Sequence, residues 1–265
     1  MHAATVRWQQ ERERAAAVEA DHGMGTSAEE LTAFFARFRV VDPGVPLVRV
    51  GPVGDGGYLV PDDLLDLAAC FSPGVAGEIG FDVDLADRGI PIHMIDKSVT
   101  GLPVHHDLID FEPLFVGTRT EPGWTTLADW VERRAPGSDD LMLEMDVEGA
   151  EWAVLLTTPS HTLRRFRIIV VELHDLHLLA KRSTLQVVSA TIDRLLEDFE
   201  LVHVHQNNYE YPVPYQGFDL HPVVEATFLR KDRVRRSGPR ARLAHPLDSA
   251  NAGVVLDQPL DRRWL

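Results

Sequence analysis

Apolar and polar positions follow a regular order along this chain from residue 47 to residue 229. Short apolar runs predict strands at residues 47–50, 68–72, 91–95, 168–173, 201–205 and 223–229, with a further strand that begins at Leu141. Helical periodicity lies between them, at residues 78–88, 126–134, 150–156 and 183–198. Strands that alternate with helices are typical of an α/β fold with a parallel, doubly wound sheet. The last two strands are joined by an irregular segment, so antiparallel pairing is open to them.

The two ends of the chain follow other patterns. Residues 1–22 read as a polar helix or a frayed end, and Ser27 with Glu30 three positions later predicts a capping box that opens a second helix. Its phenylalanines, Phe34, Phe35 and Phe38, could pack on their own domain or on a second subunit, so a homo-oligomer stays open. We therefore expect a helical extension at 1–46, one α/β domain at 47–230 and an irregular tail at 231–265 that packs on it as a strap.

Composition limits the classes of partner. The chain has 265 residues and a formal net charge of −15, which argues against nucleic acid or an anionic membrane as the main partner. No apolar run approaches the ~18 residues that cross a bilayer, and the N-terminal segment lacks the pattern of a signal peptide. The single cysteine, Cys70, excludes an internal disulfide. These features predict a soluble, cytoplasmic protein.

One edge of the predicted sheet has features of a nucleotide site. Ser72-Pro73-Gly74-Val75, followed by Gly77-Glu78, forms the turn after the first core strand, and Asp96 ends the next strand about twenty residues later. A carboxylate there can accept hydrogen bonds from both ribose hydroxyls, although a glycine-rich turn alone is more often only a turn. The second glycine cluster, Gly54-Asp55-Gly56-Gly57-Tyr58, permits close approach to a ligand, but its residue types slightly favour a hairpin turn.

Three later strands carry acids and histidines at their ends. Asp146 and Glu148 follow one strand, Glu172 and His174 share one side of the next, and His203 aligns with His205 on the third. Glu225 lies within the last strand. Each residue alone could be structural, but Asp146, His174 and His205 should share the edge where doubly wound folds bind substrates. Imidazole with carboxylate suits a general base or a metal. The absence of a Gly-x-Ser-x-Gly elbow argues against a serine hydrolase.

The chain resembles the FkbM-type S-adenosylmethionine-dependent methyltransferases over roughly residues 50–230. The resemblance rests on Asp146-Val147-Glu148-Gly149-Ala150-Glu151 after an apolar strand, on Thr126-Leu127-Ala128-Asp129 before it, and on Ile169-Val170-Val171-Glu172-Leu173-His174 after it. Asp55-Gly56-Gly57-Tyr58 and the run from His203 to Tyr209 support it. The turn after the first core strand departs from the family, because it lacks the usual Gly-x-Gly run of methyltransferases.

The resemblance implies a Rossmann-like, mostly parallel seven-stranded sheet whose last strand is antiparallel. It implies S-adenosylmethionine as methyl donor and a small-molecule acceptor, such as a hydroxyl or carboxylate of a sugar or secondary metabolite. The donor-binding residues would be Asp55, Gly56, Gly57, Tyr58, Ser72, Gly74, Glu78, Asp96 and Lys97. The acceptor would contact Glu148, Asn207, Asn208, Tyr209 and Glu225. The catalytic residues would be Asp146, which orients the acceptor, and His174 or His205, one of which acts as base.

Other hypotheses remain beside this one. A divalent metal, Mg²⁺, is an option at Asp146, Glu172 and His174, although Mg²⁺ prefers oxygen ligands. The runner-up is a nicotinamide-dependent oxidoreductase or epimerase, and the third is a catalytically silent binding module. Residues 105–123 and 206–222 are expected to be irregular loops over the site. The aromatic side chains of the second loop either contact the acceptor or pack the loop shut; they are Tyr209, Tyr211, Tyr215 and Phe218.

Overall fold

The computed structural model describes residues 25–74, 77–236, 238–239, 242–253, 260 and 262–264. Within them, seven strands form one central sheet in the order β11-β14-β10-β9-β4-β5-β6. The strands are β4 (Ala69–Pro73), β5 (Ile92–Ile95), β6 (Ile109–Glu112), β9 (Leu141–Met145), β10 (Phe166–Leu173), β11 (Phe199–Gln206) and β14 (Val224–Arg230). The doubly wound α/β fold predicted from the sequence is confirmed.

The direction of the last strand is also confirmed. The pairs β9–β10, β4–β9, β4–β5 and β5–β6 are parallel. Strand β14 lies between β10 and β11 and is antiparallel to both, with Glu225 opposite Glu172 on one side and opposite His205 on the other. The carboxyl ends of six parallel strands therefore meet at one edge, where Asp146, His174 and Asn207 follow β9, β10 and β11.

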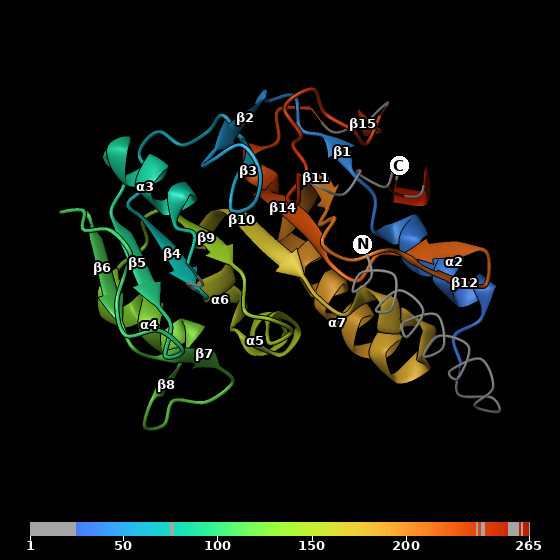
Figure 1. Ribbon diagram of the computed structural model, residues 1–265, viewed down its shortest axis with the longest axis horizontal. Coiled ribbons are helices and arrows are strands. Elements are labelled where there is room, and N and C mark those ends of the chain that lie inside the picture. Colours follow the sequence, from blue (N-terminus) through green and yellow to red (C-terminus); the bar gives the residue numbers. More distant parts are fainter. Residues whose placement is uncertain are drawn as a thin grey trace.

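Two hydrophobic cores cover the two faces of the sheet. On one face lie α4 (Leu127–Arg134), α5 (Glu151–Thr157), α7 (Arg182–Asp198) and α2 (Ala28–Arg37), which bury apolar side chains together with Phe71, Leu143 and Val171. On the other face lie α3 (Gly80–Asp87) and the hairpin of β2 (Leu47–Val50) and β3 (Tyr58–Pro61), packed on Cys70 and Met142. Figure 1 shows α3 and this hairpin along the upper side of the central sheet. Shorter elements are α6 (Ser160–Leu163), η1 (Leu176–Ala180), η2 (Lys231–Arg233) and η3 (Arg262–Trp264).

Helix α2 packs on its own chain. Ser27 caps the helix, accepting from the backbone N–H of Glu30 at 3.2 Å while the Glu30 carboxylate accepts from the Ser27 N–H at 2.8 Å, so the predicted capping box is confirmed. Phe38 is fully buried and its ring lies 6.1 Å from that of Phe228 on β14. Residues 1–22, for which the sequence predicted a polar helix or a frayed end, lie outside the described residues. No helix in the described part of the chain has the length and apolar character needed to span a bilayer.

Two segments predicted to be irregular contain strands. The segment 105–123 provides β6, which pairs with β5 and completes the sheet, and β7 (Phe115–Gly117), which pairs with β8 (Trp124–Thr126). The segment 206–222 contains a hairpin of β12 (Val213–Tyr215) and β13 (Phe218–Leu220). The remaining short strands, β1 (Val41–Asp42) and β15 (Gly238–Pro239), pair with each other.

Candidate active site

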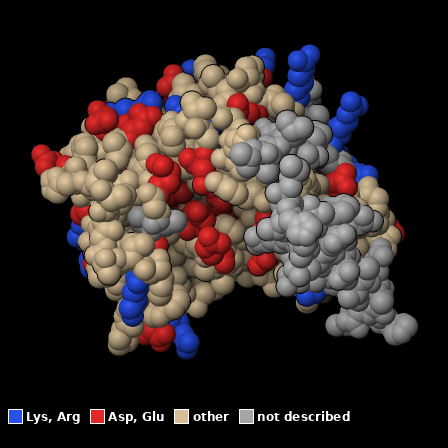
Figure 2. Space-filling view, viewed as in Figure 1, with Lys and Arg blue, Asp and Glu red and all other residues tan. Residues whose placement is uncertain are grey.

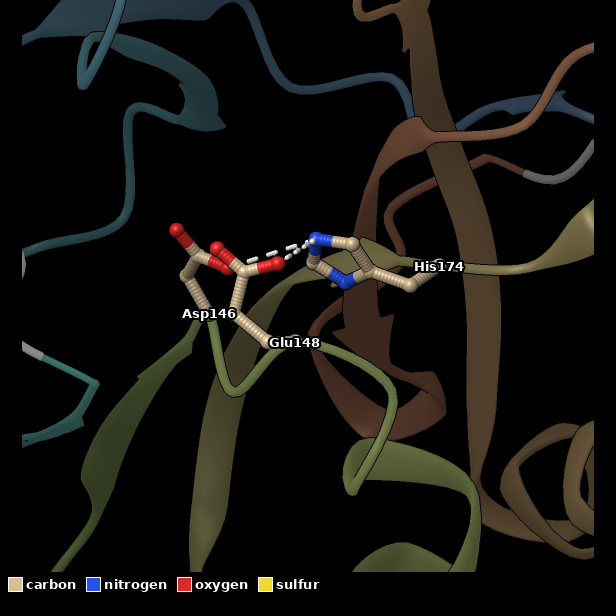
Figure 3. Close-up of side chains that lie close together, drawn as sticks. All are labelled: Asp146, Glu148 and His174. Carbon is tan, nitrogen blue, oxygen red and sulfur yellow. Dashed lines mark ion pairs between the residues drawn. The ribbon is translucent and has the colours of Figure 1, made fainter.

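Asp146, Glu148 and His174 form a compact cluster at the carboxyl edge of the sheet. Nε2 of His174 lies 3.6 Å from Oδ1 of Asp146 and 3.6 Å from Oε2 of Glu148. Figure 3 shows both carboxylates directed at the same edge of the imidazole ring. The structure thus brings together two residues predicted to be catalytic, Asp146 and His174, with Glu148, which was predicted to bind the acceptor.

The loop between β9 and α5 holds this cluster through a buried acid. Glu148 and Gly149 both have positive φ angles, +52° and +100°, so the chain turns sharply after β9. The fully buried Glu151 accepts hydrogen bonds from the backbone N–H of Gly149 at 2.9 Å and of His174 at 2.7 Å. Its carboxylate also lies 3.4 Å from Nδ1 of His174. Glu151 therefore fixes the end of β10 to the start of α5 and orients the imidazole.

The surroundings shift the pKa of both members of the Asp146–His174 pair. Burial raises the pKa of Asp146 to about 6, against the opposing effect of the His174 charge. Burial acts to lower the pKa of His174, but Glu151, Asp146 and Glu172 outweigh it and raise that pKa to about 9. At neutral pH the pair therefore consists of an imidazolium and a largely ionised carboxylate.

A narrow cavity lies beside this pair, between the sheet edge, α3 and the β2–β3 hairpin. Its volume is about 70 Å³, and it is lined by Asp55, Gly56, Tyr58, Gly74, Glu78, Phe81, Asp82, Met94, Glu144, Asp146 and Glu172. Gly74 makes the close approach of β4 to β9 feasible, because a Cβ atom at Gly74 would lie 1.6 Å from the carbonyl oxygen of Asp146. Its φ of +97° is also a conformation that favours glycine.

Buried carboxylates form the floor of this cavity. Glu144 accepts a hydrogen bond from the Ser72 hydroxyl at 2.7 Å, and Glu172 accepts one from the Tyr58 hydroxyl at 3.1 Å. Burial, and then the neighbouring charge of Asp82, raise the pKa of Glu144 well above its usual range. Burial raises the pKa of Asp82 to about 7. The cavity therefore has an acidic floor that shares protons near neutral pH.

The predicted donor-binding residues separate into two groups. Asp55, Gly56, Tyr58, Gly74 and Glu78 line the cavity. Asp96 is buried beyond it at the end of β5, where its Oδ1 accepts from the Ser98 N–H at 2.6 Å.

The other predicted donor residues lie outside the cavity lining. Ser72 lies beneath its floor and bonds to Glu144. Gly57 faces Pro52, whose carbonyl oxygen would lie 2.0 Å from an added Cβ, and the exposed side chain of Lys97 packs on Gly123. Val75 and Ala76 of the adjacent turn lie outside the described residues.

His205 lies apart from the Asp146–His174 pair. Its Nδ1 is 3.3 Å from Oε2 of Glu225, the residue opposite it on β14. Glu225 in turn accepts a hydrogen bond from Asn251 of the tail at 2.5 Å, and Asn251 also donates to Asp55 at 3.1 Å. His203, which the sequence aligned with His205, lies 3.1 Å from Asp248 of the same tail.

Asn208, which was predicted to bind the acceptor, is hydrogen-bonded to the C-terminal tail instead. Asn208 donates to the carbonyl of Ala252 at 3.1 Å and accepts from its N–H at 2.7 Å. Asn207 remains near the site, with its amide 3.5 Å from Glu172. Tyr209 is 58% exposed, and the charge of the nearby Asp55 raises the pKa of its phenol.

Two of the four aromatic side chains in the segment 206–222 pack it shut, which is one of the two alternatives that the sequence left open. Tyr215 and Phe218 are buried away from the site: the Tyr215 hydroxyl donates to the Thr26 carbonyl at 2.9 Å, and Phe218 stacks on Phe35 at 5.6 Å. They pack the β12–β13 hairpin against α2. Tyr209 and Tyr211 are the aromatic residues of this loop that keep an exposed surface.

The cluster of Asp146, Glu148 and His174 has the donor types and spacing of a metal site. Its ligand atoms all lie within 4.8 Å of one another, and Oδ1 of Asp146 has no hydrogen-bond partner among the described residues. Glu151 behind Nδ1 gives the imidazole the carboxylate partner that metal-bound histidines have. Glu172, predicted as a metal ligand, is more distant, at 4.0 Å from Nε2. A metal would require the neutral imidazole, whereas the surrounding acids favour the protonated one.

Several residues of the site were not predicted from the sequence. Glu144 shares a face of β9 with Asp146 by period-two alternation, so its position was readable from the pattern. Glu151 is part of the motif that carried the resemblance, but nothing in the sequence shows that it is fully buried. Asp82, Phe81 and Met94 line the cavity through the approach of α3 and β5, which only the fold reveals.

The seven-stranded, mostly parallel sheet and the cavity at its carboxyl edge define a Rossmann-like α/β protein. Residues 92–211, somewhat less than half of the chain, match the family model for the methyltransferase FkbM domain. The resemblance seen in the sequence is thus confirmed over these residues, which match the FkbM methyltransferase domain. Asp96, Asp146, His174 and His205 lie within the matched segment, whereas Asp55 and Gly74 precede it.

Solved structures show distant similarity. A putative hemolysin from Streptococcus thermophilus is 13% identical, with a TM-score of 0.35, over 63% of this chain and 61% of the hemolysin chain. The chain thus spans less than two thirds of that protein. A chain of a fibrillarin/Nop5p complex is 11% identical, with a TM-score of 0.37, over 62% of this chain and 72% of its own. Among curated proteins, no match was found.

Proposed function

We propose that the chain is an S-adenosylmethionine-dependent O-methyltransferase that acts on a hydroxyl group of a small molecule. The observation that carries the proposal is the Asp146–His174 pair, 3.6 Å apart, at the carboxyl edge of the sheet and within the FkbM segment. The match to the FkbM domain supports the methyltransferase class. The choice of an oxygen acceptor rests on the resemblance, and a cytoplasmic location remains a prediction.

The donor is proposed to lie across β4 and β5. Asp96, buried at the end of β5, would accept the ribose hydroxyls, and the cavity beside Gly74 would take the methionine end. The cavity volume of about 70 Å³ is below the ~300–1,000 Å³ of whole small-molecule sites, so it can enclose only part of the donor. Asp55 and Tyr58 of the β2–β3 hairpin would close it from above.

The shifted pKa values support different roles for Asp146 and His174. When bound, S-adenosylmethionine supplies a methyl group on a positively charged sulfur. The acceptor oxygen must lose its proton as it forms the new C–O bond while the S–C bond breaks. At neutral pH His174 already holds a proton, so Asp146 is the member that can accept this one. His174, held by Glu151, would orient the acceptor oxygen; His205, bound to Glu225, would stabilise the neighbouring strand pair.

Calorimetric titration of the full chain with S-adenosylmethionine, S-adenosylhomocysteine and NAD tests the proposal. We expect micromolar binding of the first two and no heat with NAD. The titrations are repeated with EDTA and with added Mg²⁺, because the cluster at His174 has the donors for a metal. Heat with NAD alone would establish the oxidoreductase hypothesis instead, and binding of neither ligand would contradict the donor site.

A pair of variants tests the proposed role of Asp96 in binding the donor. Asp96→Asn should weaken S-adenosylmethionine at least about tenfold, because a charged acceptor of two hydroxyl hydrogen bonds becomes a neutral amide. Asp107→Asn is the matched control: the Asp107 side chain is 96% exposed, and the same substitution there should leave the affinity unchanged.

A further inference from the structure

The loop between β2 and β3, residues 51–57, forms one wall of the candidate cavity. Asp55 and Gly56 of this loop line the cavity, together with Tyr58 directly after it. Three glycines of the loop have positive φ angles: Gly51, Gly54 and Gly56. Glycine loses more conformational freedom than other residues when a loop is ordered, so contacts from outside are needed to hold this loop in one position.

The C-terminal tail supplies such contacts. The side-chain amide nitrogen of Asn251 donates to Oδ1 of Asp55 at 3.1 Å and to Oε1 of Glu225 on β14 at 2.5 Å. Asn251 is only 7% exposed, whereas Asp55 is exposed. The tail backbone lies against the loop at Gly54, where an added Cβ atom would be 3.8 Å from the carbonyl oxygen of Ala250. A buried side chain of the tail thus holds an exposed acid of the loop.

The two partners of Asn251 would otherwise repel each other. Figure 2 shows acidic side chains gathered in the hollow at the centre of the molecule. Asp55 and Glu225 accept from the same amide nitrogen, so their carboxylates lie close together, and like charges at close range are unfavourable. An amide NH₂ group has two hydrogens and can bond to both. Without it, the repulsion would act to move the loop away from the sheet.

A second link joins the tail to the loop at the base of the hairpin. The Arg49 guanidinium donates to the carbonyl oxygens of Pro52 and Gly57, at 3.0 and 2.8 Å, and so connects the two ends of the loop. The same guanidinium donates twice to the carbonyl oxygen of Leu247 in the tail, at 3.1 and 3.0 Å. The tail therefore holds the loop at its base as well as at its tip.

The residue after Asn251 connects the tail to the loop that follows β11. Ala252 shares two hydrogen bonds with the side chain of Asn208, at 3.1 and 2.7 Å. The phenol of the neighbouring Tyr209 is hydrogen-bonded to Asp55. The tail, the loop at 51–57 and the loop after β11 are thus connected to one another at the mouth of the site.

We propose that Asn251 is a positioning residue, which fixes Asp55 and the loop at 51–57 over the cavity and so prepares the site for the methyl donor. The tail, although it follows the FkbM segment at residues 92–211, is then part of the functional site. This inference rests on the proposed function, because it takes the cavity as the donor site. Asn251 acts by raising the fraction of molecules whose loop is closed, and this fraction scales the apparent affinity for the donor.

Titration of the full chain with S-adenosylhomocysteine tests the inference. Asn251→Ala should weaken binding about three- to thirtyfold, because hydrogen bonds to charged groups are stronger than those between neutral groups. Thr158→Val is the matched control. Thr158 is 4% exposed and its hydroxyl donates to the Val154 carbonyl at 2.7 Å, at the end of α5 that leads back to β10. This variant also loses a buried hydrogen bond but should keep the native affinity.

Two results of these titrations would contradict the role of Asn251. Unchanged or tighter binding by Asn251→Ala would show that the contact does not prepare the site. An equal loss in Thr158→Val would show that reduced stability alone weakens binding.

A double-mutant cycle shows whether Asn251 acts through Asp55. Asp55→Ala should itself weaken S-adenosylhomocysteine, and Asn251→Ala should then add little, because the residue that it positions is gone. If the two losses simply add, Asn251 does not act through Asp55 and the inference is wrong.

Asn251→Asp provides a pH signature that a space-filling role would not give. At about pH 8 the substituted carboxyl is ionised and repels Asp55 and Glu225, so binding of S-adenosylhomocysteine should be at least about tenfold weaker than in the native protein. At about pH 5 its neighbours favour the protonated form, which can donate one hydrogen bond, and the loss should shrink to about threefold. A ratio of variant to native affinity that is the same at both pH values would argue against positioning.

Hydrogen exchange of residues 51–57 needs no donor and separates this inference from the proposed function. In Asn251→Ala this segment should exchange at least about fivefold faster, with β9 and β10 unchanged. If exchange responds in this way but the native protein binds no S-adenosylhomocysteine, the methyltransferase proposal fails and the fixed loop remains. If S-adenosylhomocysteine binds and exchange of the segment does not respond, the donor site stands and the role of Asn251 is wrong.

Discussion

Gly74 is the residue on which the geometry of the site depends most directly. A Cβ atom there would lie 1.6 Å from the Asp146 carbonyl oxygen, and its φ is +97°. We expect Gly74→Ala to lower the free energy of unfolding by about 2–4 kcal/mol, since strain and overpacking add. Gly89→Ala is the control, because Gly89 has a similar φ of +86° with open space around it. It should cost about 1 kcal/mol. Urea denaturation measures both, and equal losses would show that backbone strain alone is at work.

Asp146 should dominate the chemistry of the site. With an acceptor found by screening, Asp146→Asn is expected to lower kcat about 10²- to 10⁴-fold, the usual loss for a general base, while the donor Kd changes little. Turnover of the native protein should rise with pH as Asp146 ionises near pH 6 and fall as His174 loses its proton near pH 9. His174→Gln should remove the alkaline limb. A profile without these limbs would show that the pair is not the acid–base machinery.

The individual contacts of the C-terminal tail could not be predicted from the sequence. Asn251 is 7% exposed and bridges Asp55 and Glu225. Asn251→Ala should lower the free energy of unfolding by about 1–3 kcal/mol, because a buried carboxylate loses its donor. Asn251→Asp should be worse at neutral pH, since it places a third carboxylate between two others. Equal stability of the two variants in urea would indicate that Asn251 acts only by filling space.

The core elements were readable from the sequence because each has a long, regular pattern. Strand β10, from Phe166 to Leu173, is apolar at most positions, and α4 is capped by Thr126, whose hydroxyl accepts from the Asp129 N–H at 3.0 Å. Strand β6 was missed because its four residues are all half-buried and polar at two positions, as at a sheet edge. The β12–β13 hairpin turns at Gln216 and Gly217, both with positive φ, where the expected signal would be Asn-Gly.

Like the fold, the candidate site could be predicted from the sequence only in part. Asp146 and His174 follow adjacent strands, so strand order alone brings them together. His205 was placed with them because it also ends a parallel strand, but β14 separates β11 from β10 and supplies Glu225 as its partner. Contacts made by a distant segment, such as Ala252 with Asn208, leave no periodic trace in the sequence.

Across the whole molecule, the acids divide into two classes with opposite effects on stability. Asp140 and Asp110 are paired, by Arg230 and Arg167 in one case and by His93 and Arg134 in the other. Burial acts to raise the pKa of each carboxyl, but the pairing outweighs it and lowers the pKa below the usual value. Their contribution is therefore present above about pH 4 and is lost as pH falls through the lowered pKa. The site acids behave in the opposite way, because burial raises their pKa.

Together, the lowered pKa values of the paired acids and the raised pKa values of the site acids predict that the protein is most stable at mildly acidic pH. Between about pH 4 and pH 7 folded Asp82 keeps a proton that the unfolded chain has lost, so the free energy of unfolding falls as pH rises, by up to roughly 4 kcal/mol. His174 adds a loss in the same direction as pH rises through about 9. We expect Tm to be highest near pH 5 and to fall toward pH 8.

Asp82→Asn separates the site acids from the remaining charges. The amide fits the same space without a charge to bury, so its Tm should exceed that of the native chain at pH 8 and approach it near pH 5. Asp107→Asn removes one exposed charge and should leave the slope unchanged. Scanning calorimetry across this range measures all three proteins. If the native Tm stays level from pH 5 to pH 8, the floor of the cavity holds its charge at no cost. A ligand that brings a positive charge would then have little to neutralise.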